Sequence, residues 1–196
     1  NYNVVVGDEA GTALTTGDKN IALGFEALAT EDTGKSSVAI GYQALKTQNN
    51  DAENNNTAVG ALAGLSVTTA THNTLIGALA GDALTSGNSN VAVGYGSLTT
   101  DTLGDRNVAI GVVALETQNF TTTTDSYNVA VGYAAGSSVT TGVRNTLIGG
   151  LTGDALTTGN NNTALGFNAL AADTLGDRSV AIGVDALAAQ NFTTTT

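Results

Sequence analysis

The sequence predicts an all-β fold, a parallel β-solenoid of about eleven coils, and three observations support this fold class. First, a five-residue motif recurs, mostly with a period of 17 residues: Asn, a variable residue, a small or apolar residue, an aliphatic residue and Gly. Second, 17 residues are too few for a helical-hairpin repeat, which needs about 34. Third, β-branched residues dominate the aliphatic positions of the motif, as at Val108 and Ile110, which is typical of strands.

The first element of each coil is the motif itself, which we expect to form a short strand. Stacked parallel strands repeat every ~4.8 Å, so eleven coils predict a rod of roughly 50 Å in which identical positions form ladders. Stacked Asn side chains can hydrogen-bond along such a ladder, which favours a structural role for the leading Asn. It occurs in nine coils, at Asn3, Asn20, Asn56, Asn73, Asn90, Asn107, Asn128, Asn145 and Asn162, and Ser37 and Ser179 replace it in the other two. The closing glycines are Gly7, Gly24, Gly41, Gly60, Gly77, Gly94, Gly111, Gly132, Gly149, Gly166 and Gly183.

The second element is a short apolar segment after the motif, and the third is a polar turn. Residues 26–28 and 113–115 are examples of the apolar segment. A helix is the competing interpretation because Ala and Leu favour helices, but glycines leave stretches that are too short for an isolated helix. At the turn we expect glycines with a positive φ. These are Gly17, Gly34, Gly87, Gly104, Gly142, Gly159 and Gly176.

The repeat is interrupted at regular intervals by spacers. The spacing of the motif glycines rises to 19 after Gly41 and to 21 after Gly111, where the spacers 48–52 and 118–122 lie, and a third spacer begins at residue 190. We therefore divide the single array 1–196 into segments 1–55, 56–127 and 128–196, each ending in a spacer. Insertions in a solenoid map to one face and loops carry binding. The predicted contact loops include Phe120, Thr121, Thr122, Phe192 and Thr193.

The motif also predicts association between chains. Ala109 and Ile110 are adjacent and both apolar, and the corresponding pair is apolar in every coil. Since adjacent strand residues point to opposite faces, both faces of the strand should be dry, and small Ala favours close approach of a second chain. Neither end carries the atypical polar repeat that caps a solenoid, so we expect a fragment of a longer array or a unit that stacks end to end.

Composition excludes several classes of function. Charged residues make up 12% of the chain, with a formal net charge of −11, which argues against binding to nucleic acid. There is no Cys, and the only His is His72, so disulfides, zinc–thiolate sites and a catalytic histidine set are not expected. No apolar run reaches the ~18 residues of a membrane span, and no phosphate-binding glycine cluster is present. We expect no enzyme and no cofactor, although the many Asp and Asn oxygens leave calcium open.

The pattern Asn-x-Ala-(Val/Ile/Leu)-Gly-x-x-Ala-Leu, seen in residues 20–28, resembles the head repeats of YadA-like trimeric autotransporter adhesins. It is also similar to repeats in some bacteriophage tail-fibre proteins. The resemblance covers nearly the whole chain, although these coils are somewhat longer than the commonest head repeat. It implies a left-handed parallel β-roll with two short strands per coil and three chains side by side. It also implies an extracellular location, on a cell surface or a virion.

The leading functional hypothesis is a structural and adhesive fibre segment that supports attachment to a host or surface through an unidentified receptor or glycan. A self-assembling filament subunit is one alternative. An ice-binding solenoid is another, although threonine follows the ladder Asn only in pairs of coils. The aromatic residues leave two interpretations open, packing at coil corners or an exposed stripe for glycan or protein contact. Five of them follow the motif glycine directly, at Phe25, Tyr42, Tyr95, Tyr133 and Phe167.

Overall fold

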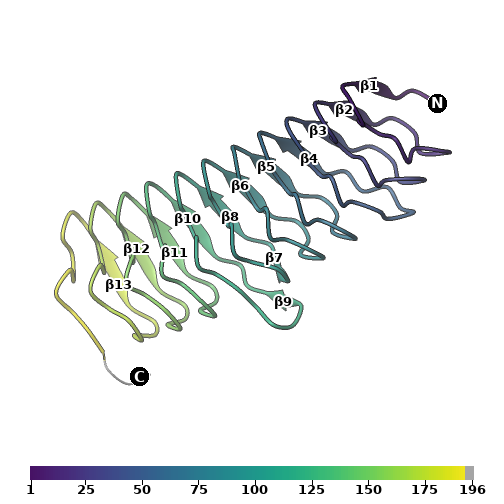
Figure 1. Ribbon diagram of the computed structural model, residues 1–196. Coiled ribbons are helices and arrows are strands. Elements are labelled where there is room, and N and C mark those ends of the chain that lie inside the picture. Colours follow the sequence, from purple (N-terminus) through teal and green to yellow (C-terminus); the bar gives the residue numbers. More distant parts are fainter. Residues whose placement is uncertain (193–196) are drawn as a thin grey trace.

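The computed structural model describes residues 1–192, which wind through stacked coils into a rod with the termini at opposite ends (Figure 1). Eleven strands form one parallel sheet along the rod, and no helix occurs within residues 1–192 that could cross a membrane. The strands of this sheet, in order, are β1 (Val4–Val6), β2 (Ile21–Leu23), β3 (Val38–Ile40), β4 (Thr57–Val59), β5 (Thr74–Ile76), β6 (Val91–Val93), β8 (Val108–Ile110), β10 (Val129–Val131), β11 (Thr146–Ile148), β12 (Thr163–Leu165) and β13 (Val180–Ile182). The predicted all-β parallel solenoid of about eleven coils is confirmed.

The register of the sheet follows the sequence repeat. Val108 pairs with Val129 and Ala109 with Ala130, although the 21-residue spacing separates their two coils. The additional length of this spacer coil forms a separate two-stranded sheet, in which β7 (Gly104–Asp105) pairs with β9 (Thr124–Asp125). Figure 1 shows the β9 loop projecting beyond the neighbouring turns. Spacers therefore widen a coil without disturbing the main sheet.

The expectation of two strands per coil is wrong. The apolar segment after the motif forms turns, in which residues such as Glu26 and Leu28 adopt a positive φ of 52°. Its N–H groups donate to the next coil, for example from Leu28 N to the carbonyl O of Ala44 at 3.0 Å. These contacts stack the turns without a second ladder of extended residues.

The expected positive φ at the turn glycines is also wrong. It is instead the motif glycine that has a positive φ, of 141° at Gly60, and a Cβ there would lie 2.5 Å from the carbonyl O of Gly77. Gly17 is needed for a different reason, because a Cβ there would lie 2.8 Å from the carbonyl O of Gly34. In the turn, the left-handed residue comes two positions after the glycine, as at Lys19, where φ is 60°.

The interior is narrow, and coils of two kinds fill it. We number each coil from position 1 at the ladder Asn, so the motif Gly is position 5. In apolar coils, position 9 is Gly and position 12 is Leu or Val, as at Gly81 and Leu84. In polar coils, position 9 is Leu and position 12 is Asp, Glu or Gln, as at Leu98 and Asp101. A Cβ on Gly81 would lie 2.9 Å from Leu84 Cδ1, so the two positions compensate each other in volume.

Candidate functional site: the outer sheet face, its edges and the spacers

The Asn ladder joins each coil to the next inside the rod. The Oδ1 atom of Asn20 accepts the N–H of Ser37 at 2.9 Å, and its Nδ2 donates to the carbonyl O of Gly34 at 2.8 Å. Equivalent pairs of bonds recur at Asn3, Asn56, Asn73, Asn90, Asn128, Asn145 and Asn162. Asn107, in a spacer coil, instead donates through Nδ2 to Asn90 Oδ1 at 3.1 Å. The ladder thus satisfies buried backbone groups and closes each turn.

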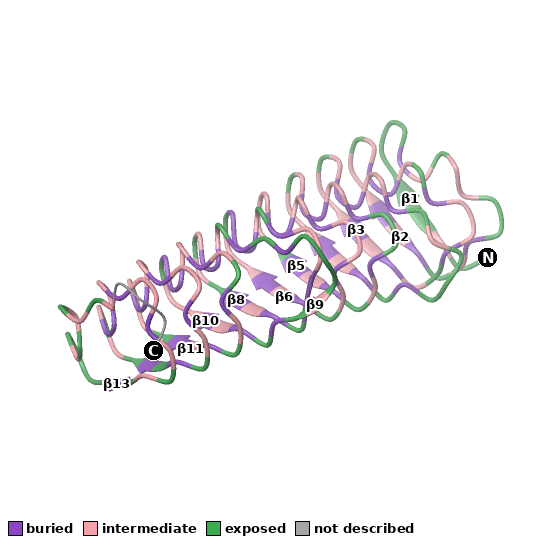
Figure 2. Ribbon diagram, turned by 90° about the horizontal axis from the view of Figure 1, so that it is seen from below, coloured by how far each residue is buried: buried purple, intermediate pink, exposed green. Residues whose placement is uncertain are grey.

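The outer face of the sheet carries the large aliphatic residues, which corrects the expectation that the small residue faces a second chain. In β8, Ala109 is fully buried whereas Ile110 is 37% exposed. The centre of each strand from β2 to β13 is buried, and the flanking positions are half-buried or exposed (Figure 2). Ala therefore fills the thin interior, with Leu75 and Leu147 in its place in β5 and β11, and Val, Ile, Leu and Thr side chains form a continuous outer face along the rod.

An aromatic column borders this face at position 6, where each strand has just ended. Its side chains are partly exposed, from 39% for Phe25 to 62% for Tyr133, so the rings both pack at the coil corners and present a surface. Phe25 and Tyr42 stack on each other with ring centroids 5.6 Å apart. The column consists of Phe25, Tyr42, Tyr95, Tyr133 and Phe167, with aliphatic residues, Gly or Asp8 in the other coils.

A basic column borders the opposite edge, at the pre-ladder position, which is the residue immediately before position 1. It contains no acidic residue in any coil, although the chain has 17 acidic residues. Four of the six basic residues and the single histidine lie there, at Lys19, His72, Arg106, Arg144 and Arg178, and none of the five is buried. Sequence reasoning missed this column because the five residues are distant in the chain and only the coil register places them together.

A buried polar clamp supports each spacer, and sequence reasoning missed it as well. In the best-defined copy, Gln118 Nε2 donates to Asp101 Oδ2 at 2.6 Å, and Gln118 Oε1 accepts from Asn128 Nδ2 at 2.8 Å. The other carboxylate oxygen, Oδ1, accepts the N–H of Gly104 at 3.0 Å and of Phe120 at 3.5 Å. Because Asp101 is fully buried, loss of water raises its pKa, while these N–H donors act in the opposite direction. The clamp therefore fixes the first residues of the spacer to the interior.

The same clamp occurs at all three spacers. Gln48 donates to Glu31 at 2.9 Å, and Gln190 donates to Asp173 at 3.0 Å. In every copy the acid precedes the Gln by one coil of 17 residues. The sequence signal was an acid and a Gln at position 12 of successive coils, always just before an insertion.

The contact-loop residues differ in their exposure. Phe120 is buried, so the expectation that it is a surface contact is wrong, and its N–H binds the clamp. Thr121 and Thr122 are exposed, and Phe192 is half-buried. Thr193 lies outside the described residues. The exposed part of the second spacer therefore consists of Asn119 and the residues from Thr121 onward, with Phe120 buried between them.

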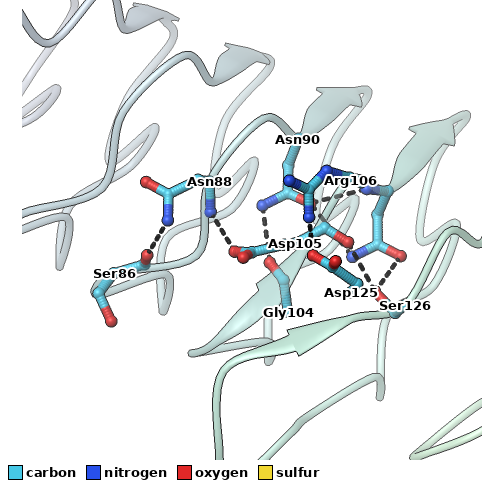
Figure 3. A network of polar contacts seen from close by, with 9 residues as sticks. Ser86, Asn88, Asn90, Gly104, Asp105, Arg106, Asp125 and Ser126 are labelled. Carbon is cyan, nitrogen blue, oxygen red and sulfur yellow. Dashed lines mark hydrogen bonds and ion pairs between the residues drawn. The ribbon is translucent and has the colours of Figure 1, made fainter.

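The base of this spacer is a polar network, drawn in Figure 3. Asp105 Oδ1 accepts the N–H of Asn88 at 2.6 Å, and Arg106 of the pre-ladder column forms an ion pair with Asp125 across β7 and β9. The guanidinium of Arg106 also lies 5.7 Å from the ring centroid of Tyr127. The ion pair is solvent-exposed and contributes little stability by itself, but together these contacts hold the spacer against the preceding turn.

The described residues offer interaction surfaces and no enclosed site. Within residues 1–192 there is no pocket and no group of three or more His, Asp or Glu side chains that could hold a metal ion. Asp154 keeps a buried carboxylate oxygen with no hydrogen-bond partner among these residues, and burial raises its pKa. A single carboxylate is not a calcium site, so the calcium hypothesis gains no support from it.

Comparisons with known proteins identify no relative of this chain. No protein-family description matches it, no curated protein matches it, and no solved structure matches it. Any functional proposal must therefore rest on the chain's own residues and geometry.

Proposed function

We propose that this chain is a structural and adhesive segment of an extracellular fibre, on a cell surface or a virion, in which three copies lie side by side. In this proposal the coil is left-handed, as the resemblance to YadA-like head repeats implies. The rod holds contact regions away from the surface that carries it, and the same rod presents the spacers. The supporting observation is the outer sheet face, which carries an aliphatic residue at position 4 in every coil and is uncovered in a single chain.

The outer face favours a second copy as its cover. Soluble monomers rarely expose contiguous apolar patches of more than a few hundred Å², because such patches bind to other surfaces. Here Ile76, Ile148 and Leu165 are 39%, 37% and 46% exposed, and equivalent side chains lie above and below them in neighbouring coils. A repeating face is best matched by another repeating face, and copies of this chain have the same rise per coil.

The spacers are the proposed contact regions with a receptor or glycan. They recur at every fourth coil in the second and third segments, and their first residues are fixed by the clamp while Thr121 and Thr122 are exposed. Loops held on a rigid scaffold are common binding elements. Loops that recur at regular intervals, rich in threonine in the second and third spacers, suit multivalent, individually weak adhesion.

A filament subunit is the second candidate, supported by the two end strands. Among the described residues, β1 and β13 each pair with only one neighbour, and Val6 and Ile182 are 62% and 65% exposed. Such open edges template further strand pairing. In this alternative, mass grows along the rod axis and does not stop at a small oligomer.

Sedimentation equilibrium of the purified chain tests the proposal. We expect a species of about 58 kDa, three chains of 19.4 kDa. Replacing outer-face residues, in the triple variant I76K/I110K/I148K, should yield a folded monomer, because burying lysine charges in an apolar contact is costly. The matched control T141K places the same charge on an exposed turn and should remain associated. A wild-type monomer would overturn the trimer, and open-ended growth would favour the filament.

The adhesive part is tested separately, with beads coated with the chain on panels of glycans and matrix proteins. Deleting residues 121–124 restores a 17-residue coil and should reduce adhesion without changing the oligomer. Unchanged adhesion after this deletion would remove the second spacer from the contact region.

A further inference from the structure

Between coils 6 and 10, two columns on opposite edges of the sheet share a two-coil period that the fold does not require and that coils 1–5 do not follow. At position 6, aromatic residues occupy coils 6, 8 and 10, at Tyr95, Tyr133 and Phe167, whereas the coils between them carry Val112 and Gly150. The three rings are exposed, at 56%, 62% and 54%. The interior repeats every four coils, so packing of the core does not explain a two-coil alternation on the surface.

The pre-ladder column repeats with the same period and in the same coils. Arg106, Arg144 and Arg178 end coils 6, 8 and 10, and they alternate with Tyr127 and Asn161. All three arginines are exposed. Each coil that presents an arginine on one edge therefore presents an aromatic ring on the other.

The chain itself shows that an arginine of this column packs on an aromatic ring. The Arg106 guanidinium lies 5.7 Å from the centroid of Tyr127, within the range of a cation–π contact. Arg106 also pairs with Asp125, so it serves the spacer as well. No ion pair engages Arg144 or Arg178 among residues 1–192.

We propose that the basic edge of one copy packs against the aromatic edge of the next, with Arg106, Arg144 and Arg178 lying on Tyr95, Tyr133 and Phe167 of the neighbour. This contact rests on the lateral association proposed above and adds its partner edge and its register. The two edges lie at opposite ends of the strands, so each copy offers one to each of two neighbours. The contact is thus heterologous, not two-fold.

The shared period makes this contact selective for register. With the copies level, all three arginines lie on rings, and a stagger of two coils, roughly 10 Å, still places two of them on rings because both columns repeat every two coils between coils 6 and 10. A further shift by one coil, ~4.8 Å, moves the arginines toward Val112 and Gly150, where no π face is available. An apolar face that repeats in every coil cannot discriminate such shifts, whereas these edges can.

Charge favours the same pairing. Each copy carries a net charge of −11, so copies repel one another overall. The pre-ladder column is the one edge with clustered positive charge, and the residues that follow the rings of the contact at position 7, Gly96, Ala134 and Asn168, carry no charge. An approach through the basic edge therefore avoids placing acids against acids.

Cross-linking between two single-cysteine variants tests the contact, because the chain has no cysteine of its own. R144C and Y133C are purified separately, mixed, allowed to reassemble and treated with a short bis-maleimide. We expect an R144C–Y133C heterodimer as the main cross-linked product. The matched control mixes R144C with V112C, which is also exposed but lies one coil away from Tyr133, and should cross-link at least several-fold less.

Three outcomes would overturn the proposal while leaving lateral association intact: equal cross-linking to V112C, a dominant R144C–R144C product, or no cross-link in a sample that sediments as an oligomer. A monomeric wild type would instead refute the proposed function. A second measurement uses R106Q/R144Q/R178Q, for which we expect at least a tenfold weaker association. Unchanged association, with loss of binding to heparin beads, would assign the arginines to an acidic polysaccharide and refute the contact.

Discussion

Coils 5 and 6 have the same backbone path but opposite interiors. In coil 5, Gly81 and Leu84 combine with Leu75, so that the interior is apolar apart from the ladder residue Asn73. In coil 6, Leu98 fills the space beside the strand and Asp101 occupies the place of Leu84. The sheet register passes through both coils unchanged. The solenoid therefore constrains the volume of the interior and tolerates polar side chains there when every polar atom has a partner.

The difference between these coils follows the spacers. An apolar side chain at position 12 closes a turn of fixed length, but it offers nothing to the backbone of an inserted loop. A carboxylate there accepts N–H groups from both the turn and the spacer, as Asp101 does from Gly104 and Phe120. The clamp works for spacings of 19 and 21 alike. We infer that polar coils exist because insertions need buried hydrogen-bond acceptors.

Replacing the acidic residue of one clamp should have the largest effect on the stability of the chain. In D101A, Gln118, Gly104 and Phe120 lose a buried acceptor, and each buried donor left unsatisfied costs about 1–3 kcal/mol. Hydrogen exchange measures this locally, and the amide of Phe120 should lose its protection. The control D154A removes a carboxylate that has an oxygen without a partner, and its cost should be far smaller. Equal losses of stability in D101A and D154A would refute the role of the clamp in holding the spacer.

Truncating the apolar residue at position 12 of coil 5 should have the next largest effect on stability. L84A leaves a cavity, and core truncations of this kind cost about 2–5 kcal/mol. The loss should remain local, because stability in a solenoid is a sum over coils and their interfaces. Exchange of amides in coils 4–6 should therefore accelerate, while the spacer amide of Phe120 remains protected. A loss of protection at Phe120 equal to that in D101A would mean that the two kinds of coil do not differ in how they hold spacers.

The fold was predictable because its repeat is carried by single positions. Motif glycines and the ladder Asn recur at fixed spacing, and each has a local physical reason, a close approach such as that of Gly60 to Gly77 or a bond such as Asn20 to Gly34. Which strand residue faces inward was not predictable in the same way. Ala109 and Ile110 are both apolar, so hydrophobicity alone does not distinguish them, and the narrow interior selects the smaller.

The candidate site was less predictable because its parts repeat with other periods. The clamp needs an acid and a Gln one coil apart, and neither is unusual in an acidic chain. The pre-ladder column requires alignment of many coils with unequal lengths before Arg106, Arg144 and Arg178 share an edge. The burial of Phe120 depends on the clamp, so its exposure could not be deduced before the clamp was known.

The pH dependence of stability should also separate the two kinds of coil. Burial raises the pKa of Asp101 in the fold above the ordinary value of 3.8, so the folded chain binds this proton more tightly than the unfolded chain. The contribution of this proton to the stability of the fold is fully present below pH 3.8 and is lost as the pH rises through the raised pKa of Asp101. The free energy of unfolding of the wild type minus that of D101N, measured with urea from pH 3 to 7, should therefore decrease as the pH rises. The corresponding difference in unfolding free energy between wild type and L84A should not change with pH. A difference for D101N that increases with pH would contradict the raised pKa of Asp101.

The smallest expected effect on stability comes from a comparison of two blocks that align without gaps, residues 73–120 and 145–192. In the first, Asp82 accepts a hydrogen bond from Thr99, whereas in the second Ala171 replaces that threonine and an oxygen of Asp154 is left without a partner. A171T supplies the missing hydroxyl and should stabilise the chain by about 0.5–1.5 kcal/mol, the net value of one hydrogen bond. T99A should destabilise it by a similar amount. Urea unfolding measures both, and because burial holds the Asp154 pKa above its usual range, the gain in A171T should come with a lower pKa. A gain without that shift would mean that the added side chain stabilises by packing, and that the unpartnered oxygen is not the reason the second block differs from the first.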